Sequence, residues 1–332
     1  MKTIITILVV CLVQCTHLRA APNPAIWDSW NTCLVGVKSI SVILHNSQFP
    51  EGKKIGAEES CDYINSTQRI NLIVHGFMSS ANATRFEDLA SALVKKGEIA
   101  FGIDWSQGAC TDDVPIINTG EYWKATRNTR QTGQLVANFT IALNKGCEIP
   151  LANIRYIGHS LGAHVSGFAA KAVEKSLNDK IPIIIGLDPA DPGFGNNKEE
   201  ERLSISDAKR VVTFHTSILG INKKIGHLLL EFNNLQPGCN SINVACSHSK
   251  SIEYLTEMIK GHQYFGVPFV NEGFWESAGI KLRNMFSSSN KSENSTTDCI
   301  TMDESVLQSD STVEGQFRIR TENTKDTVNC KQ

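Results

Sequence analysis

The sequence predicts an α/β fold in one domain, with a mostly parallel central sheet flanked by helices. From residue 70 onward, short apolar strand-like segments alternate with longer helix-like segments, which is typical of βαβ units. Residues 181–187 form a nearly continuous β-branched run, as buried parallel strands usually do. The chain has 332 residues and is 41% hydrophobic, which is enough for one core of roughly 250–300 residues.

Each expected element has a local signal. Residues 86–96 predict a helix that Gly97 stops, and an apolar face over residues 135–143 predicts a second helix that Gly146 ends. A third helix is expected to run to about residue 177. The predicted strands are short apolar runs at residues 70–74, 99–105, 154–157, 181–187, 211–214, 228–232 and 316–321. Polar residues 287–297 predict an exposed loop before the last strand.

The first twenty residues predict a secretory signal peptide. Lys2 precedes an apolar run over residues 4–13, and small residues follow at Ala20 and Ala21, near which we expect cleavage. A buried N-terminal helix is the alternative. The single α/β domain would then cover residues 21–332, and no later segment has the eighteen continuous apolar residues of a spanning helix.

Cysteine usage agrees with an oxidising compartment. The predicted mature chain keeps an even number of cysteines, as expected for disulfides, and none stands in a CxxC spacing, which argues against structural zinc. These are Cys33, Cys61, Cys110, Cys147, Cys239, Cys246, Cys299 and Cys330. Candidate N-glycosylation sequons begin at Asn65, Asn82, Asn138, Asn290 and Asn294.

The charge balance limits the partners. The chain carries 32 Lys and Arg residues against 34 Asp and Glu residues. Because no basic stripe is present to contact phosphates along a strand, a nucleic-acid partner is not expected. Neither a metal nor an organic cofactor is implied.

The sharpest feature is the G-x-S-x-G motif over residues 158–162, between a predicted strand and a predicted helix. A nucleophilic serine must stand clear of its sheet on a tight strand-to-helix turn, where larger side chains at Gly158 and Gly162 would collide with backbone. The following helix directs its positive N-terminal end toward Ser160. An ordinary Gly-Ser turn is the alternative reading.

A serine hydroxyl needs a base that is itself held by an acid. The acid is expected next in chain order, at the carboxyl end of a strand. Asp188 directly follows the strand predicted at 181–187, and Asp191 is its rival. A plain Asp-Pro turn is the alternative for Asp188.

The base must come later, and four histidines do so. His215 and His227 border strand-like segments, where packing or hydrogen bonding would explain them, and His262 follows a helix. His248 follows Cys246 by two residues, in a loop that a disulfide could fix. Spacing alone favours His248 and leaves the others open.

An oxyanion loop is predicted after the first buried strand, at His75, Gly76 and Phe77. The backbone N–H groups of Phe77 and Leu161 would stabilise a tetrahedral oxyanion. Alternatively, His75 caps the strand.

Together these segments resemble the pancreatic-lipase family of α/β-hydrolases. The resemblance covers most of residues 60–262, through INLIVHGF, IDWS, IRYIGHSLGAHVSGF, IIGLDPADPGF, VVTFHTS and CSHSKS. It implies an α/β-hydrolase fold with Ser160 as nucleophile, Asp188 as orienting acid and His248 as base.

Departures from the lipases make the chain similar to the insect phospholipase A1 branch, including its venom enzymes. Lipases carry a long lid between two cysteines before the catalytic histidine, whereas here Cys239 and Cys246 enclose only six residues. The loop within residues 211–232 also looks short, and no room remains for the β-sandwich domain of pancreatic lipase. The resemblance implies a lid disulfide Cys239–Cys246 and a disulfide Cys33–Cys110.

We therefore expect a secreted phospholipase A1 that releases the sn-1 fatty acid of phosphoglycerides through an acyl-enzyme. The alternatives are a lipase for triacylglycerols or galactolipids and, in another class, an inactive lipid carrier. We expect a monomer in transient contact with a membrane surface. Apolar loop residues could make that contact, although scattered apolar residues are common on surfaces: Ile218, Leu219, Ile221, Ile242 and Val244.

Overall fold

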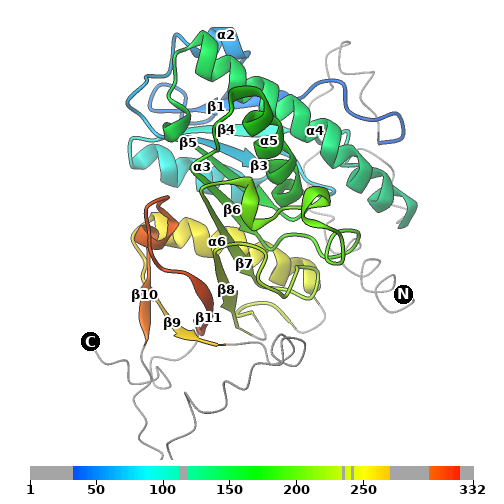
Figure 1. The fold of residues 1–332 in the computed structure, drawn as a ribbon, viewed down its shortest axis with the longest axis vertical. Coiled ribbons are helices and arrows are strands. Elements are labelled where there is room, and N and C mark those ends of the chain that lie inside the picture. Colours follow the sequence, from blue (N-terminus) through cyan, green and yellow to red (C-terminus); the bar gives the residue numbers. More distant parts are fainter. Residues whose placement is uncertain (1–32, 112–118, 234–235, 241–242, 270–298, 322–332) are drawn as a thin grey trace, which may run out of the picture.

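The computed structural model describes residues 33–111, 119–233, 236–240, 243–269 and 299–321 (Figure 1). Within this part of the chain the strands form one sheet in the order β10-β9-β11-β8-β7-β6-β5-β3-β4-β1-β2. Its central strands all run parallel. They are β3 (Ile70–Val74), β4 (Ile99–Asp104), β5 (Ile154–His159), β6 (Ile183–Leu187), β7 (Arg210–His215), β8 (Leu228–Phe232) and β11 (Gly315–Ile319).

Antiparallel strands close the two edges of the sheet. They are β1 (Ser41–His45), β2 (Lys53–Lys54), β9 (Tyr264–Pro268) and β10 (Ile300–Met302). The sequence did not predict these strands, because short edge strands lack the continuous apolar signal of buried ones.

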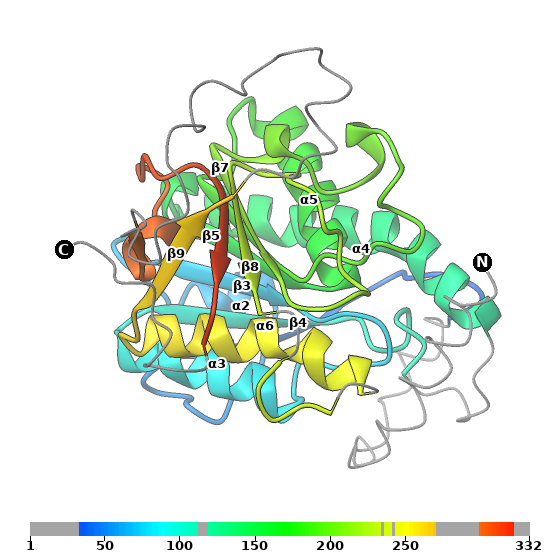
Figure 2. The ribbon, with the colours of Figure 1, turned by 90° about the horizontal axis from the view of Figure 1, so that it is seen from below.

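Helices cover both faces of the sheet, as Figure 2 shows. On one face, α3 (Thr84–Lys95) lies beside α6 (Val244–Ile259); α4 (Thr119–Gly146) and α5 (Leu161–Leu177) lie on the other. Successive side chains of a strand point to opposite faces. Leu72 and Val74 of β3 therefore pack toward α4 and α5, while Ile73 packs toward α3 and α6. The remaining helical segments are α2 (Ala57–Ser60), η2 (Leu151–Asn153), η3 (Glu199–Glu201), η4 (Ile205–Asp207) and η5 (Glu304–Leu307).

The predicted α/β-hydrolase fold is confirmed, and every strand predicted from the sequence is present. The bounds differ locally: β6 begins after Pro182, which has no N–H for a strand ladder. The largest difference is α4, which begins at Thr119 although only residues 135–143 predicted a helix. Its first half is polar, so local periodicity did not indicate it.

Parallel strands place their carboxyl ends at one edge of the sheet, where α/β proteins usually bind ligands. β5 ends at His159, β6 at Leu187 and β3 at Val74, so the segments that follow each strand meet at this edge. Ser160, Asp188 and the loop beginning at His75 are thus brought together from distant parts of the sequence.

Three disulfides link the described residues. Two are the pairs that the resemblance implied, Cys33–Cys110 and Cys239–Cys246. The third, Cys61–Cys147, joins the end of α2 to the end of α4. No described helix is long and apolar enough to cross a bilayer. The predicted signal peptide, the loop at 287–297, Ile242, Cys330, and the sequons at Asn290 and Asn294 lie outside the described residues.

Candidate active site

Ser160 stands between β5 and α5 in a conformation that ordinary residues avoid. Its φ is 56° and its ψ is −122°, and its backbone is held by hydrogen bonds from its N–H to the Leu187 carbonyl and from Ala163 N–H to its own carbonyl. A non-glycine residue in such a region stores strain, which clusters at functional sites. The turn lifts the Ser160 side chain off the carboxyl end of the sheet.

The glycines on either side make this turn possible. A Cβ atom at Gly162 would lie 2.1 Å from the Val74 carbonyl oxygen, and one at Gly158 would lie 2.3 Å from the Gly162 carbonyl oxygen. Both neighbours are backbone atoms, so no side-chain movement can relieve the overlap. The G-x-S-x-G pattern therefore reflects the close approach of β3, β5 and α5 around the serine.

Asp188 follows β6 and is fully buried. Its Oδ2 lies 2.7 Å from Nδ1 of His248 and accepts a hydrogen bond from the Ser217 hydroxyl. Its Oδ1 accepts hydrogen bonds from the backbone N–H groups of Thr216 at 2.8 Å and Ser217 at 3.3 Å. Like Ser160, Asp188 has a positive φ, of 45°. The carboxylate is thus fixed in one orientation with its imidazole partner.

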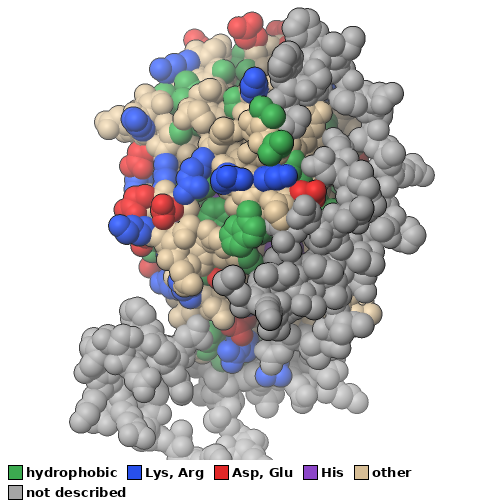
Figure 3. All heavy atoms as spheres, turned by 90° about the vertical axis from the view of Figure 1, so that its right-hand side faces the viewer, with side chains coloured by type: hydrophobic (Ala, Val, Ile, Leu, Met, Phe, Trp, Pro, Cys, Tyr) green, Lys and Arg blue, Asp and Glu red, His purple; other side chains and the backbone are tan. Residues whose placement is uncertain are grey.

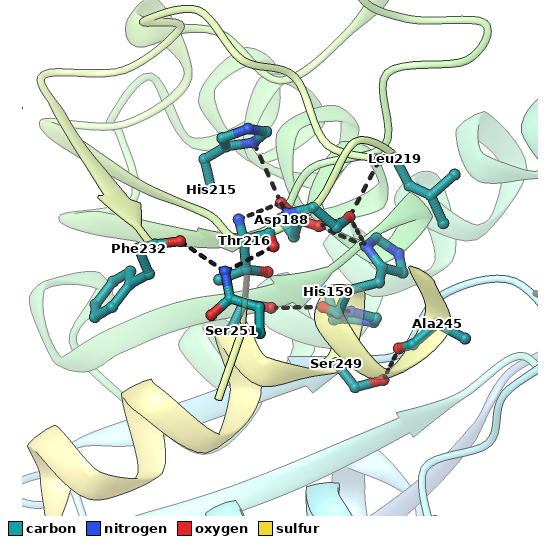
Figure 4. A network of polar contacts seen from close by, with 12 residues as sticks. His159, Asp188, His215, Thr216, Leu219, Phe232, Ala245, Ser249 and Ser251 are labelled. Carbon is teal, nitrogen blue, oxygen red and sulfur yellow. Dashed lines mark hydrogen bonds and ion pairs between the residues drawn. The ribbon is translucent and has the colours of Figure 1, made fainter. Parts of the chain in front are cut away.

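A second imidazole faces the same carboxylate. His215 points toward Asp188 in Figure 4, with its Nδ1 3.4 Å from Asp188 Oδ1 in an ion-pair contact that lacks hydrogen-bond alignment. Burial alone would raise the pKa of the Asp188 carboxyl, but the imidazoles of His215 and His248 outweigh it and hold the pKa below its usual range. Burial lowers the pKa of His215, and Asp188 more than offsets this, so the net shift is upward.

His248 lies in the first turn of α6, and this corrects the prediction that it stands in a loop. Asn243 caps the helix by accepting a hydrogen bond from Cys246 N–H at 2.9 Å, and the Cys239–Cys246 disulfide anchors the same turn. The sequence predicted a loop at His248 because it has no apolar periodicity before Ile252 that would indicate a helix. The helix holds the imidazole more firmly than a loop would.

His159 supports His248 from the other side. Its ring centroid is 4.5 Å from that of His248, and its Nε2–H donates to the His248 carbonyl oxygen at 3.1 Å. Burial holds the pKa of His159 well below its ordinary value, and the adjacent His248 lowers it further. The ring is therefore neutral and serves as a fixed donor.

Ser160 and His248 line the same cavity, which has a volume of about 700 Å³. Among the described residues, no hydrogen bond joins Ser160 Oγ to the imidazole. Catalytic hydrogen bonds are often long without substrate and tighten when it binds. The arrangement suits a nucleophile whose base engages it once an ester occupies the cavity.

The loop after β3 passes directly beside the serine. A Cβ atom at Gly76 would lie 2.7 Å from Ser160 Cβ. Within the described structure the N–H of the next residue, Phe77, donates to no protein acceptor, and Leu161, as the first residue of α5, has no acceptor within its helix. Both N–H groups are thus available to an oxyanion. His75 is buried and accepts from Trp105 N–H, which suits a support for this loop.

The rival residues are engaged elsewhere. The carboxylate of Asp191 packs against Gly195: a Cβ atom added at Gly195 would lie 1.9 Å from Asp191 Oδ1. His227 Nδ1 accepts from Val211 N–H at 3.0 Å, and the His262 ring lies 4.6 Å from that of Tyr264.

Sequence reasoning missed the role of Ser217. Its hydroxyl donates to Asp188 Oδ2 and lies 3.3 Å from His248 Nδ1, so it touches both members of the acid–base pair. The sequence predicted that His215 is packed or hydrogen-bonded, but did not indicate Asp188 as its partner. The stretch VVTFHTS contains both residues, but nothing in its pattern indicates that β7 places them at Asp188.

Of the apolar loop residues expected to contact a membrane, Ile218 is 67% exposed. Leu219 and Val244 are partly buried and Ile221 is buried in the core, which removes Ile221 from the candidates. The sequon residues Asn65, Asn82 and Asn138 are all exposed. The described residues contain no cluster of side chains that could hold a metal ion.

The chain is similar in sequence to known proteins over most of its length. A family model described as "Lipase" matches residues 45–272. The "Phospholipase A1" of Solenopsis invicta is 44% identical over 346 aligned positions that cover 100% of both chains. The "Phospholipase A1" of Dinoponera quadriceps is 36% identical over 83% of this chain and 71% of its own. That of Vespa velutina is 40% identical over 71% of this chain and 82% of its own.

Proposed function

Because this chain belongs to the lipase family, whose members hydrolyse carboxylic esters, we propose that it is a phospholipase A1 with Ser160, His248 and Asp188 as its catalytic triad. The observation that carries the proposal is the Asp188–His248 pair at the cavity that also contains the strained Ser160. The full-length similarity to an insect phospholipase A1 supports the substrate class.

In the proposed reaction, Ser160 Oγ attacks the sn-1 ester carbonyl while His248 Nε2 takes its proton. Asp188 holds the Nδ1 proton and stabilises the imidazolium. The N–H groups of Phe77 and Leu161 receive the oxyanion. The imidazolium then protonates the leaving lysophospholipid. Water, deprotonated by the same imidazole, attacks the acyl-enzyme and releases the fatty acid.

The short loop at the cavity supports a phospholipid over a triacylglycerol. The Cys239–Cys246 disulfide closes a segment with a sequence separation of 7. Such a segment is too short to cover an apolar site in the way that a long mobile lid does. A polar head group can therefore remain at the cavity mouth during catalysis.

We also place the protein outside the cell, where its disulfides would persist. The predicted signal peptide at residues 1–20 supports this location. N-terminal sequencing of the protein collected from the medium of expressing insect cells should begin near Ala21. A protein retained in the cells with Met1 intact would contradict the extracellular location.

Product analysis tests the proposed activity. The substrate is a phosphatidylcholine with different fatty acids at sn-1 and sn-2, and the enzyme should release the sn-1 acid alone. Ser160→Ala should abolish release, whereas Ser91→Ala, on α3 outside the cavity lining, should not change it. Undiminished release by the Ser160 variant would end the proposal. Faster release from triacylglycerol than from phosphatidylcholine would favour a lipase.

A further inference from the structure

The cavity around Ser160 has two chemically different ends. One end is mainly apolar, which suits a fatty acyl chain; Phe77, Tyr122, Ala190, Pro192 and Leu219 line it. The part of the lining that comes from α3 and α6, together with Lys260 at the end of α6, includes the charged side chains Arg85, Asp88, Glu253, Glu257 and Lys260. An ester bound at Ser160 would therefore meet apolar surface on one side and fixed charges on the other.

Arg85 is the charged residue that is best anchored near the triad. Its Nη1 donates to the Ser249 hydroxyl, and Ser249 directly follows His248 on α6. The next residue on α3, Phe86, has its ring centroid 6.1 Å from that of His159, which in turn packs on His248. The hydrogen bond to Ser249 therefore places the exposed guanidinium of Arg85 beside the residue that follows His248.

Among the described residues, most of the N–H donors of Arg85 have no protein acceptor. A guanidinium has five N–H donors in a planar fork that matches two oxygens of a phosphate. Among the described residues, no carboxylate forms an ion pair with Arg85. By contrast, Glu253 pairs with Lys250 at 2.6 Å, and Glu257 accepts from the Tyr264 hydroxyl.

We propose that Arg85 binds the phosphate of the phosphoglyceride head group and so selects phospholipids over neutral esters. The proposal rests on the function given above. The phosphate of a phosphoglyceride is separated from the sn-1 ester only by the glycerol carbons. With the acyl chain at the apolar end and the ester at Ser160, the phosphate reaches the side of the cavity where Arg85 lies. Asp88, one turn further along α3, then faces an ammonium head group.

The test compares two soluble substrates with Arg85→Gln. These are a short-chain phosphatidylcholine kept below its micelle concentration and the neutral ester 4-nitrophenyl butyrate. Loss of a charge-assisted hydrogen bond should lower kcat/KM for phosphatidylcholine about 10- to 100-fold more than for the butyrate ester. Arg85→Lys should recover part of this difference, since it keeps the charge but not the fork. Lys95→Gln, an exposed cation in the last turn of the same helix, is the matched control and should change neither rate.

Equal losses on both substrates would mean that Arg85 only positions Ser249 and α6, and would overturn the proposal. No loss on either substrate would also overturn it. Because the substrate is monomeric, attraction to a lipid surface cannot produce the expected result. A loss seen only on anionic vesicles would assign Arg85 to membrane attraction instead.

A second measurement tests phosphate binding by Arg85 independently of phospholipid hydrolysis. Glycerophosphocholine carries the head group without an ester, so it should inhibit butyrate hydrolysis competitively, with an inhibition constant at least about tenfold weaker in Arg85→Gln. If the wild-type protein hydrolyses the butyrate ester but no phospholipid, the proposed function fails, and this inhibition still tests the phosphate site. Equal inhibition of both proteins would refute the role of Arg85.

Discussion

At the scale of single residues, the site depends on two strained backbone positions. Ser160 and Asp188 both have positive φ, and both follow the last residue of a buried parallel strand. Hydrogen bonds from neighbouring strands hold each of them, including one of 2.8 Å from Asp188 N–H to the Phe214 carbonyl. Strain of this kind persists only where the surrounding structure determines the conformation. The sheet therefore fixes Ser160 and Asp188, the proposed nucleophile and acid, relative to each other.

Replacing Asp188 by Asn should lower kcat about 10³- to 10⁴-fold, because an amide can stabilise neither the required tautomer of His248 nor its imidazolium. Steady-state kinetics on phosphatidylcholine measures the loss, and circular dichroism verifies the fold. Asp191→Asn is the control. A variant of Asp188 that retains more than a tenth of the wild-type kcat would exclude this carboxylate as the orienting acid.

His215 should shift the acid limb of the pH–rate profile. Its raised pKa keeps the imidazole cationic to higher pH, where it offsets part of the Asp188 charge. Glu231 and Asp191 act on His215 in the same direction as Asp188. In His215→Asn nothing offsets the Asp188 charge in this way, so the active site retains a proton to higher pH. The acid limb of kcat/KM should then move to higher pH by about half a unit.

The contact between His215 and Asp188 should also make the free energy of unfolding depend on pH. A raised pKa means that the His215–Asp188 pair contributes fully below the ordinary pKa of histidine and is lost as pH rises through the raised value. The difference in the free energy of unfolding between wild type and His215→Asn, measured in urea, should therefore shrink as pH rises from the ordinary pKa of histidine through the raised pKa of His215. His262→Asn, at an exposed histidine far along the chain, should alter neither profile. An acid limb that stays in place in His215→Asn would show that His215 serves packing alone.

At the scale of elements, the strand–turn–helix unit of β5 and α5 depends on close backbone contacts. The whole N-terminal half of α5 is buried, and His164 within it is held by the Ala190 carbonyl at 2.8 Å and by Leu203 N–H at 3.1 Å. Burial lowers the pKa of His164 to about 3, so this histidine is a neutral brace. The elbow is therefore a rigid unit whose tolerance for added atoms is small.

Gly162→Ala should destabilise the protein by roughly 1–3 kcal/mol, because its new methyl group would overlap the Val74 carbonyl oxygen. Urea unfolding followed by tryptophan fluorescence measures this change. Gly146→Ala makes a matched comparison, since a Cβ there has no neighbour within 4 Å and the residue ends α4. Equal stability of the two variants would mean that the elbow can relax.

At the scale of the whole molecule, disulfides and a mixed surface suit a protein that works outside the cell. On the described part of the face shown in Figure 3, basic, acidic and apolar side chains all occur. This agrees with the net charge of −2. Cys61–Cys147 spans 86 residues and joins α2 to α4, whereas Cys239–Cys246 spans only 7.

The two disulfides should therefore differ in effect. Cys61→Ser with Cys147→Ser should lower the free energy of unfolding by about 2–4 kcal/mol, since closing a longer loop removes more entropy from the unfolded chain. Cys239→Ser with Cys246→Ser should cost less stability but lower kcat, because this bridge anchors the turn that carries His248. Calorimetry and lipid hydrolysis measure the two effects. A greater stability loss from the short bridge would contradict the loop-entropy argument.

The sequence by itself determined the central parallel strands, the elbow around Ser160 and the placement of Asp188. Those features depend on local patterns: buried parallel strands are continuously apolar, and a tight turn requires glycine where backbones touch. The motif resemblance added His248, which spacing alone had left open among four histidines.

Only the tertiary structure decided the rest. The edge strands, the long α4, and the helical setting of His248 depend on partners distant in the chain, which leave no local periodicity. The contacts of His215 and Ser217 with Asp188, and of Arg85 with Ser249, arise because parallel strands and facing helices bring separate segments to one edge of the sheet. Long-range packing creates these contacts, so no short stretch of sequence contains them.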